Sequence, residues 1–409
     1  MKRILLTSVL AGLMLASSAM ALFIDPRAAL KDINDYRTKI FADARAENKT
    51  PNLDEVNAEV KKRALLAVNG ESADKIAPAD GYVWAQLFQL AGDLKSACKA
   101  AERFVDTGPT AAEKYSAQAL MLSCCNTMGE GDMVAKLLNS MEPPIFAQQM
   151  ALATSTAGLY VDTVRSSMGT EAALQLLSQM EVKVRAANTA NDQEVTRKKG
   201  SIASLVTAKA EILNETGKRN EAVRLLDNLV SEFGEKSPEA RSVTSLKNRI
   251  LLIGSPAPAV TFERSHGEFK GLESLKGKVV ILDFFAHWCG PCIRSFPDMK
   301  KLYSDYKDKG LEIVGLTTYY GYYKTENQKT RDMPKDTEFG KMSDFIKEHE
   351  LPWPVVYGER TNFEAYGVTG IPHVAVIDRQ GNVKKIKIGY SPASFAEFRK
   401  EIEHLINEK

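Results

Sequence analysis

The stretch that decides the fold of this chain is VVILDFFAHWCGPC, residues 279–292. Its first half is rich in β-branched and aromatic residues and predicts a buried strand. Apolar residues at helical spacing follow, at Ile293, Phe296, Met299, Leu302, Tyr303 and Tyr306. Cys289 and Cys292 therefore lie where a strand ends and a helix begins, and the free N–H groups and dipole of that helix end favour a thiolate over a thiol. Their spacing lets the two sulfurs close a disulfide, so the stretch predicts a redox pair.

Two cysteines at this spacing also occur in zinc sites. A tetrahedral zinc would need a second pair of ligands, and the sequence has no second CxxC and no HxxxH. We therefore predict neither a metal nor a cofactor, with the two sulfurs carrying the chemistry.

The residues around this pair resemble the thioredoxin superfamily. Asp283 stands six residues before Cys289, where thioredoxins carry a buried acid, and the resemblance implies that it moves the proton of Cys292 during disulfide exchange. A desolvated carboxyl with a raised pKa suits that task, whereas a solvated acid at a strand end is the alternative. The resemblance also implies that Trp288 packs beside the disulfide and that Gly290 and Pro291 shape the turn, all three contacting substrate.

A second motif, GVTGIPH at residues 367–373, precedes the apolar run of residues 374–377. Thioredoxin-like proteins place a cis-proline here, facing the cysteine pair. The resemblance assigns this role to Pro372 and gives Ile371 the backbone contact with the substrate cysteine. A cis bond is inexpensive only before proline, and a trans proline that opens a strand is the alternative. His373 either titrates near neutrality beside the pair or has a structural hydrogen-bonding role.

A closer resemblance, over about residues 250–409, is to the TlpA/ResA-like redoxin branch. It is carried by GSPAP, LKGKVV, LEIVGL and DRQGN, at residues 254–258, 275–280, 311–316 and 378–382. Asp283 and the Gly290-Pro291 dipeptide are instead those of thioredoxin itself, which favours a reductant. Peroxiredoxins share the entry to the domain but carry Pro-x-x-x-Thr/Ser-x-x-Cys. Residues 282–289 contain neither proline nor threonine, so a thiol peroxidase is the weaker alternative.

The N-terminus has the pattern of a secretory signal peptide over residues 1–21. Met1-Lys2-Arg3 is followed by about 13 apolar residues and by an Ala-x-Ala site ending at Ala21. The apolar stretch is too short to span a bilayer. We therefore expect a soluble, exported, periplasmic protein. In an oxidising compartment, a reductant needs an electron donor, which is often membrane-bound.

Three further cysteines, Cys98, Cys124 and Cys125, lie in the first half of the chain. In an exported protein, a bridge from Cys98 to Cys124 or Cys125 is one interpretation. Buried free thiols in helices are the other, because cysteine often serves as a small hydrophobic residue. A bridge between the sequence neighbours would be strained.

Residues 22–250 have helical spacing of Ala, Leu and Glu and little strand patterning. Short turns recur with separations of 39, 38 and 48 residues, at Gly92, Gly131, Gly169 and Gly217. Each glycine stands between two candidate helices and suits a left-handed C-cap. A period near 40 indicates an α-solenoid, with hairpins that loosely resemble tetratricopeptide repeats. Such a domain binds a protein partner on a concave surface, or else serves packing or dimerisation.

These patterns predict a multidomain chain. An all-α, solenoid-like domain of helical hairpins spans residues 22–250 and an α/β thioredoxin-like domain spans residues 251–409. The net charge of +2 gives no reason to expect nucleic acid. Residues 319–323, with four tyrosines, form either an exposed surface for a protein substrate or a self-packed loop.

We predict an exported thiol-disulfide oxidoreductase that acts on protein thiols and disulfides. Besides the thiol peroxidase, the alternative is a helical scaffold with an inactive redox domain.

Overall fold

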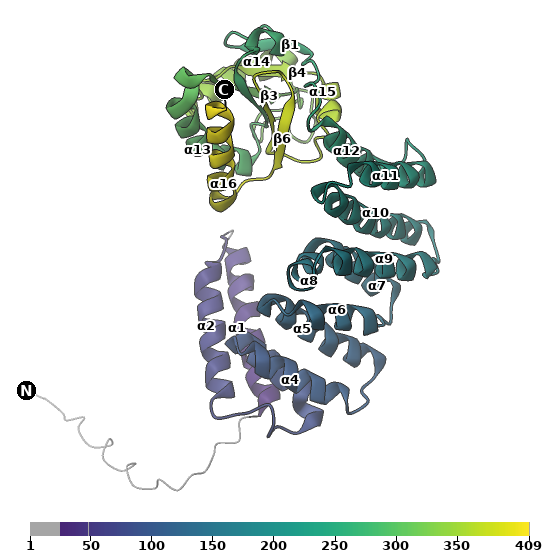
Figure 1. The fold of residues 1–409 in the computed structure, drawn as a ribbon. Coiled ribbons are helices and arrows are strands. Elements are labelled where there is room, and N and C mark those ends of the chain that lie inside the picture. Colours follow the sequence, from purple (N-terminus) through teal and green to yellow (C-terminus); the bar gives the residue numbers. More distant parts are fainter. Residues whose placement is uncertain (1–24, 48, 409) are drawn as a thin grey trace, which may run out of the picture. The chain divides into compact units, whose positions relative to one another are not determined.

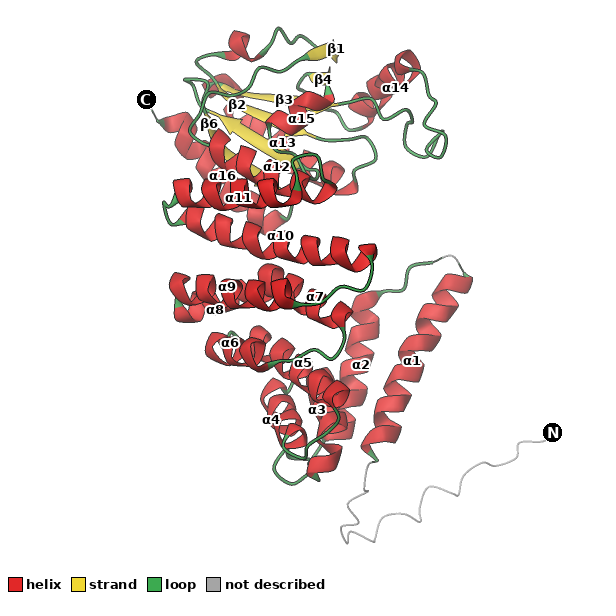
Figure 2. Cartoon of the chain, turned by 90° about the vertical axis from the view of Figure 1, so that its right-hand side faces the viewer, coloured by secondary structure: helices red, strands yellow, loops and turns green. Residues whose placement is uncertain are grey.

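The computed structural model describes residues 25–47 and 49–408 of the chain. The predicted signal peptide, residues 1–21, lies outside the described residues. Helices continue up to Leu252 and a six-stranded sheet follows, which confirms the predicted fold class (Figures 1 and 2). No helix within the described ranges combines the length and apolarity needed to cross a bilayer.

The chain divides into two compact units. One contains residues up to 149 together with 159–173, and the other contains residues 150–158 and 174–409. The division therefore lies inside the helical array, whereas the change from helices to sheet lies close to residue 250. The last helices of the array belong to the same unit as the sheet.

The first unit consists of antiparallel helix pairs. Its helices are α1 (Pro26–Ala46), α2 (Leu53–Val68), α3 (Gly81–Ala91), α4 (Leu94–Val105), α5 (Ala111–Met128), α6 (Gly131–Ser140) and α8 (Val161–Met168). Polar caps fix where they begin: Asp93 accepts from the Ser96 N–H, and Thr110 forms a capping box with Glu113. Helices α7 (Phe146–Ser155) and α9 (Thr170–Ala186) lie across the division between the units.

All three of Gly92, Gly169 and Gly217 follow helices with positive φ, at 89°, 91° and 81°. Gly92 is the left-handed C-cap that was predicted, whereas Gly169 caps α8 with an extended ψ of 172° and is not left-handed helical. The prediction for Gly131 is wrong, because this residue begins α6 and the left-handed C-cap of α5 is Gly129. Gly131 is needed for a different reason. A Cβ there would lie 2.6 Å from the Thr163 carbonyl oxygen, so α6 and α8 can approach this closely only without a side chain.

In the second unit, α10 (Asp192–Glu215), α11 (Arg219–Phe233) and α12 (Pro238–Leu252) pack on one another in sequence. Ser237 caps α12 by accepting from the Ala240 N–H, and Pro238 takes the first helical position. Helix α12 buries one apolar stripe, formed by Ala240, Val243, Leu246 and Ile250.

The sheet has the strand order β1-β4-β3-β2-β5-β6. Its strands are β1 (Phe262–His266), β2 (Val279–Phe284), β3 (Leu311–Thr317), β4 (Val355–Gly358), β5 (His373–Ile377) and β6 (Val383–Ile388). Strands β2, β3 and β4 are parallel, and β1, β5 and β6 pair antiparallel with their neighbours. The connecting helices are α13 (Gly290–Tyr306), α14 (Lys335–Glu348), α15 (Arg360–Ala365) and α16 (Pro392–Asn407).

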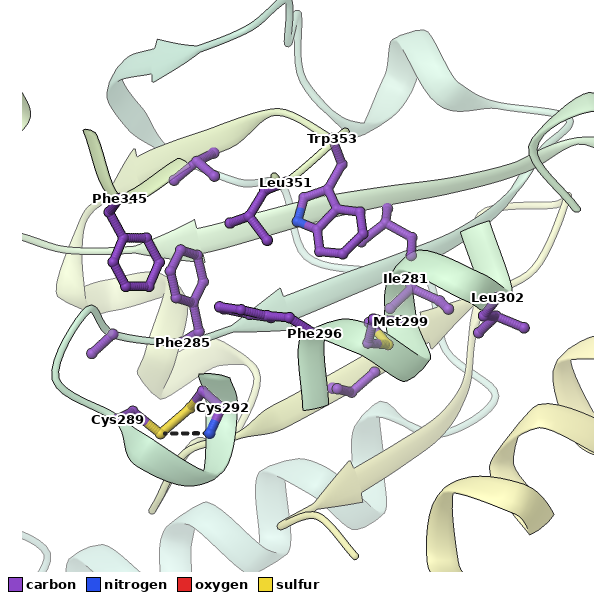
Figure 3. Close-up of a cluster of buried hydrophobic side chains, with 14 of the residues drawn as sticks. Ile281, Phe285, Cys289, Cys292, Phe296, Met299, Leu302, Phe345, Leu351 and Trp353 are labelled. Atoms are coloured by element: carbon purple, nitrogen blue, oxygen red, sulfur yellow. Dashed lines mark hydrogen bonds between the residues drawn. A yellow bond between two sulfur atoms is a disulfide. The ribbon is translucent and has the colours of Figure 1, made fainter. Parts of the chain in front are cut away.

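Two apolar cores cover the two faces of this sheet. Successive side chains of β2 point alternately into the two cores, so Ile281 belongs to one core and Leu282 to the other. The first core includes Phe296 of α13 and Phe345 of α14, and the disulfide lies at its edge (Figure 3). The second includes Tyr366 and the last residue of α12. This alternation determines which side chains of β2 can reach the cysteines.

Candidate functional site

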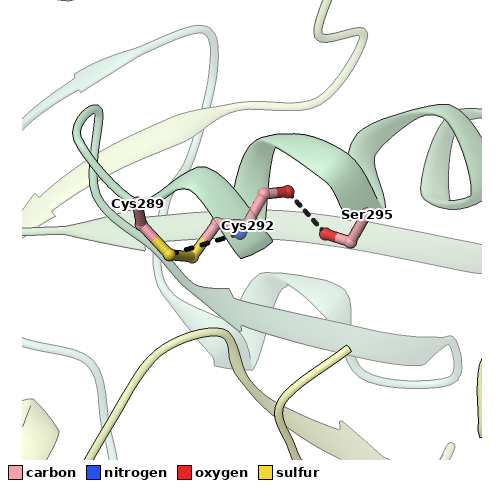
Figure 4. The surroundings of a disulfide bond; sticks show 3 residues. All are labelled: Cys289, Cys292 and Ser295. Carbon is pink, nitrogen blue, oxygen red and sulfur yellow. Dashed lines mark hydrogen bonds between the residues drawn. A yellow bond between two sulfur atoms is a disulfide. The ribbon is translucent and has the colours of Figure 1, made fainter. Parts of the chain in front are cut away.

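The two predicted cysteines form a disulfide where β2 leads into α13 (Figure 4). Cys289 is the N-cap of α13, and its sulfur accepts a hydrogen bond of 3.2 Å from the Cys292 N–H. The sulfur therefore lies on the free N–H groups of a helix N-terminus, where negative charge is stabilised. Cys289 retains 3% exposure and Cys292 has none, so an incoming sulfur can reach only Cys289. Ser295 holds the next turn by donating to the Cys292 carbonyl oxygen at 2.6 Å.

Asp283 is buried at the end of β2, with 1% of its surface exposed. It is separated by one residue from Ile281 and from Phe285, which belong to the same core as both cysteines, so strand alternation directs its carboxyl to the cysteine face. Neither carboxyl oxygen has a hydrogen-bond partner among the described residues. Burial raises the pKa of Asp283 to about 7, because removal from water disfavours the charged form. A carboxyl with this pKa can accept or return a proton at neutral pH.

The peptide bond between Ile371 and Pro372 is cis, as predicted. Pairing of β5 with β2 sets His373 opposite Phe284, the last residue of β2. Pro372, directly before His373, therefore lies at the end of β2 that leads into the segment with Cys289. The preceding backbone is open. Within the described chain, no hydrogen bond occupies the N–H or C=O groups of residues 369–371.

His373 does not face the redox pair. It lies opposite Phe284 in the β2–β5 ladder, and its ring meets the Phe284 ring edge-on at 5.5 Å, on the second core. Burial lowers the pKa of His373 to about 4, so the ring is neutral at physiological pH. Both ring nitrogens lack partners of good geometry among the described residues. The prediction that this residue titrates near neutrality beside the pair is therefore wrong, because the strand register directs it away from the cysteines. Its structural hydrogen-bonding role stays a prediction.

Two buried residues outside the predicted set, His287 and Glu338, support the active-site turn. The His287 Nδ1 accepts from the Lys324 N–H at 3.1 Å. The Glu338 carboxylate accepts from the N–H groups of Tyr320 and Gly321, both at 2.9 Å. Burial lowers the pKa of His287 to about 4 and raises that of Glu338. Together they fasten the loop after β3 to the segment that carries the cysteines.

The tyrosine side chains of this loop pack against neighbouring side chains and do not form an exposed surface. Tyr322 and Tyr323 are buried, with 4% and 7% exposure, and their rings surround His287. Tyr319 stacks obliquely on Tyr357 at 4.4 Å. The self-packed alternative is therefore confirmed, and the prediction of an exposed tyrosine surface is wrong.

The remaining predicted residues surround the disulfide from the solvent side. Trp288 is 44% exposed and meets the Tyr320 ring edge-on at 5.4 Å. Gly290 and Pro291 are the first two residues of α13. A Cβ at Gly290 would make only an ordinary contact of 3.5 Å with Arg294, so packing alone does not require a glycine there.

The other three cysteines are free thiols. Cys98 on α4 and Cys125 on α5 bring their sulfurs within 3.7 Å, at hydrogen-bonding distance and without a disulfide. A hydrogen bond with Cys124, together with burial, raises the pKa of Cys98 to about 12. Hydrogen bonding to Cys98 and burial raise the pKa of Cys125 as well. The sequence left open a disulfide bridge or free thiols for these cysteines, and in the structure they are free thiols. The described residues also contain no group of three or more His, Cys, Asp or Glu side chains arranged to hold a metal ion.

The part of the chain that carries this site is similar to known proteins. Residues 252–402 match the family model described as Redoxin. A thiol-disulfide oxidoreductase ResA from Bacillus cereus is 33% identical over 140 residues, which cover 34% of this chain and 71% of that relative. The ResA of Bacillus subtilis (strain 168) is 31% identical over 137 residues, covering 33% and 67%. A solved thiol:disulfide interchange protein of the thioredoxin family from Chlorobium tepidum TLS is 26% identical, with coverage of 37% and 97% and a TM-score of 0.29.

Proposed function

The chain belongs to the ResA-like thiol-disulfide oxidoreductases of the redoxin family, and we propose that it is an exported member that reduces disulfides in client proteins. The observation that carries this proposal is the Cys289–Cys292 pair on a helix N-terminus, with a buried acid directed to the same face that has no hydrogen-bond partner among the described residues. The direction of electron flow rests on that acid and on the dipeptide between the cysteines.

In the proposed reaction, the Cys289 thiolate attacks a client disulfide and one client sulfur leaves as a thiolate. Cys292 then attacks the Cys289 sulfur, and the second client sulfur leaves. The client gains two electrons and two protons while Cys289 and Cys292 become a disulfide. The exposure of the two sulfurs supports this order, since only Cys289 is accessible.

Asp283 takes the proton of Cys292 as that thiol becomes a nucleophile. A general base works best when its pKa is close to the ambient pH, and burial brings the pKa of Asp283 to about 7. On oxidation of the pair the carboxyl holds the proton, and on reduction it returns it.

Pro372 and Ile371 hold the client strand beside Cys289. The N–H and C=O groups of residues 369–371 are free of partners within the described chain, so they can pair with an extended client segment as one more strand would. Trp288, Gly290 and Pro291 form the opposite rim of this contact.

Export and the electron donor complete the proposal. A dithiol in an oxidising compartment stays reduced only if an electron donor reduces its disulfide again. A membrane-bound carrier of thiols or electrons would be such a donor. The helical array would then bind a protein partner or the client. The N-terminal sequence pattern supports export.

The order of attack is tested by trapping. In Cys292→Ser the first step proceeds and the second cannot, so we expect mixed disulfides between Cys289 and clients, recovered without reductant and identified by mass spectrometry. Cys289→Ser is the matched control and should trap nothing. Trapping by Cys289→Ser and not by Cys292→Ser would reverse the assignment of the two sulfurs, and equal trapping by both variants would contradict a fixed order of attack.

The direction of electron flow is tested by the reduction potential of the pair, measured against glutathione redox buffers. A value near that of thioredoxin, about −270 mV, would make the protein a reductant. A value near that of DsbA, about −120 mV, would make it an oxidant and would overturn this part of the proposal.

A further inference from the structure

A cleft of about 790 Å³ opens beside the redox site, and one of its walls is a helix of the array. Trp288, Tyr320 and Ile371 line it on the side of the cysteines, and Arg241, Thr244 and Asn248 of α12 line it on the other. All of these residues belong to the second compact unit. A cleft of this size lies near the upper end of the range that encloses drug-sized ligands, so it can hold a short segment of polypeptide.

The α12 wall follows from the sequence of that helix. Its buried stripe is apolar, whereas a polar stripe with spacing i, i+3, i+4 and i+7 lines the cleft: Arg241, Thr244, Ser245 and Asn248. Residues at these spacings share one face of a helix. The helix thus separates its core contacts from a continuous polar face directed at the redox site.

Several contacts fix this wall in place. Asn248 donates to the Glu364 carbonyl oxygen at 3.3 Å, and Arg249 donates to the Gly367 carbonyl oxygen at 2.9 Å. The backbone at Gly367 touches α12 so closely that a Cβ would lie 2.5 Å from the Ser245 carbonyl oxygen. Leu252 belongs to the second core of the sheet. The helix is therefore anchored to the loop that leads into Pro372.

The chemistry of the lining suits a peptide backbone. Hydroxyl and amide side chains predominate on α12, and the charged residues of the cleft balance, with Arg241 and Arg360 against Glu235 and Glu364. Neither arginine side chain has a hydrogen bond or ion pair within the described chain, so both are available to carbonyl oxygens of a bound segment. On the facing wall, residues 369–371 offer unpaired backbone groups.

We propose that α12 and the loop before Pro372 form the two walls of one client-binding cleft, which takes the extended polypeptide segment next to the reactive client cysteine. This inference rests on the proposed function and extends it. The redox domain supplies the exchange chemistry, and the last helix of the array selects polypeptide over small disulfides. A folded client would have to present the cysteine on an extended or unfolded segment.

The test compares two substrates with the full-length chain, reduced beforehand: a fluorescent disulfide-linked peptide and a small aromatic disulfide. Thr244→Trp fills the cleft and should slow peptide reduction about tenfold or more, with the small disulfide reduced at the wild-type rate. Arg241→Ala removes a donor without adding volume and should slow peptide reduction about threefold through KM. Arg224→Ala, an exposed arginine on α11 outside the cleft, is the matched control and should change neither rate.

Unchanged peptide reduction in both cleft variants would overturn the inference. It would also be overturned if both substrates slowed equally, since that result would mean damage to the redox site itself. If wild-type protein reduced neither substrate, the proposed function would fail, and that failure is visible without any variant. If Thr244→Trp does not fold, Arg241→Ala still decides between these outcomes.

Discussion

The described chain holds two groups of cysteines whose surroundings differ. Cys289 and Cys292 lie at the N-terminus of α13 and are joined by a disulfide. Cys98, Cys124 and Cys125 lie within α4 and α5, on helix interiors, and remain free although two sulfurs are 3.7 Å apart. A helix terminus offers unpaired N–H groups to a thiolate, whereas a helix interior offers none. The comparison teaches that the redox reactivity of a cysteine depends more on whether it lies at a helix N-terminus than on its distance to another sulfur.

The largest effect should come from removing the nucleophile. Cys289→Ser should lower the rate of insulin disulfide reduction by more than roughly a thousandfold, because no other group can form the mixed disulfide. Cys125→Ser, the matched substitution in the other group, should change this rate by less than about twofold. A comparable loss in both variants would break the comparison.

Next in size is the effect of the buried acid on exchange. Asp283→Ala should slow client reduction about a hundredfold near pH 7, the usual contribution of a general acid or base. The loss should shrink at higher pH, where hydroxide removes the Cys292 proton. Stopped-flow rates across pH measure this. A loss independent of pH would assign Asp283 a structural role only.

The same residue should also make stability depend on pH. The pKa of Asp283 is about 7 in the folded protein and about 4 in an unfolded chain. The folded state therefore binds the additional proton between these values, and the free energy of unfolding falls as pH rises through that window. The variant Asp283→Ala lacks this pH dependence. Its free energy of unfolding, relative to that of wild type, should therefore rise by up to roughly 4 kcal/mol between about pH 4 and pH 8.

Urea denaturation of both proteins at the two pH values measures this gain. Asp308→Ala, which replaces an exposed acid just after α13, is the control and should leave the slope unchanged. If wild type and Asp283→Ala showed parallel pH dependence, the folded pKa of Asp283 would not be raised.

A smaller effect should follow from removing the Glu338 carboxylate, which holds the loop after β3. Glu338→Ala leaves the N–H groups of Tyr320 and Gly321 without their acceptor and should cost roughly 2 kcal/mol of stability. The accompanying change in Trp288 fluorescence would report a displaced Tyr320 ring. An unchanged free energy of unfolding would mean that the tyrosines hold the loop without the carboxylate.

The last prediction concerns the second cysteine group in the reduced protein. The pKa of Cys98, raised to about 12, leaves it a thiol at neutral pH. Iodoacetamide should therefore label Cys98 and Cys125 at least about a hundredfold more slowly than Cys289. Mass spectrometry of timed samples measures these rates, and urea-unfolded protein is the control in which all five label alike. Equal labelling in the native protein would contradict the comparison.

Much of the site was predictable because its signals are local. The strand, the two cysteines and the following helix are adjacent in the chain. The cis bond before Pro372 was predicted from the resemblance to thioredoxin-like proteins, and a cis bond is inexpensive only before proline. Helical hairpins were predictable from periodicity in the same way. The turn at Gly131 was not, because a second glycine two residues earlier has the same local pattern and only the contact with Thr163 distinguishes them.

By itself, the sequence determined the cysteine pair between a strand and a helix and the order of helices before sheet, since each depends on neighbouring residues. The buried acid and the cis-proline were predicted from the resemblance to thioredoxin-like proteins. Only the tertiary structure decided that His373 faces away from the cysteines, that Glu338 captures a loop 17 residues away, and that α12 forms a wall of the cleft. These depend on strand register and on contacts between residues far apart in the chain. Side-chain pattern does not encode such contacts until the sheet brings its strands together.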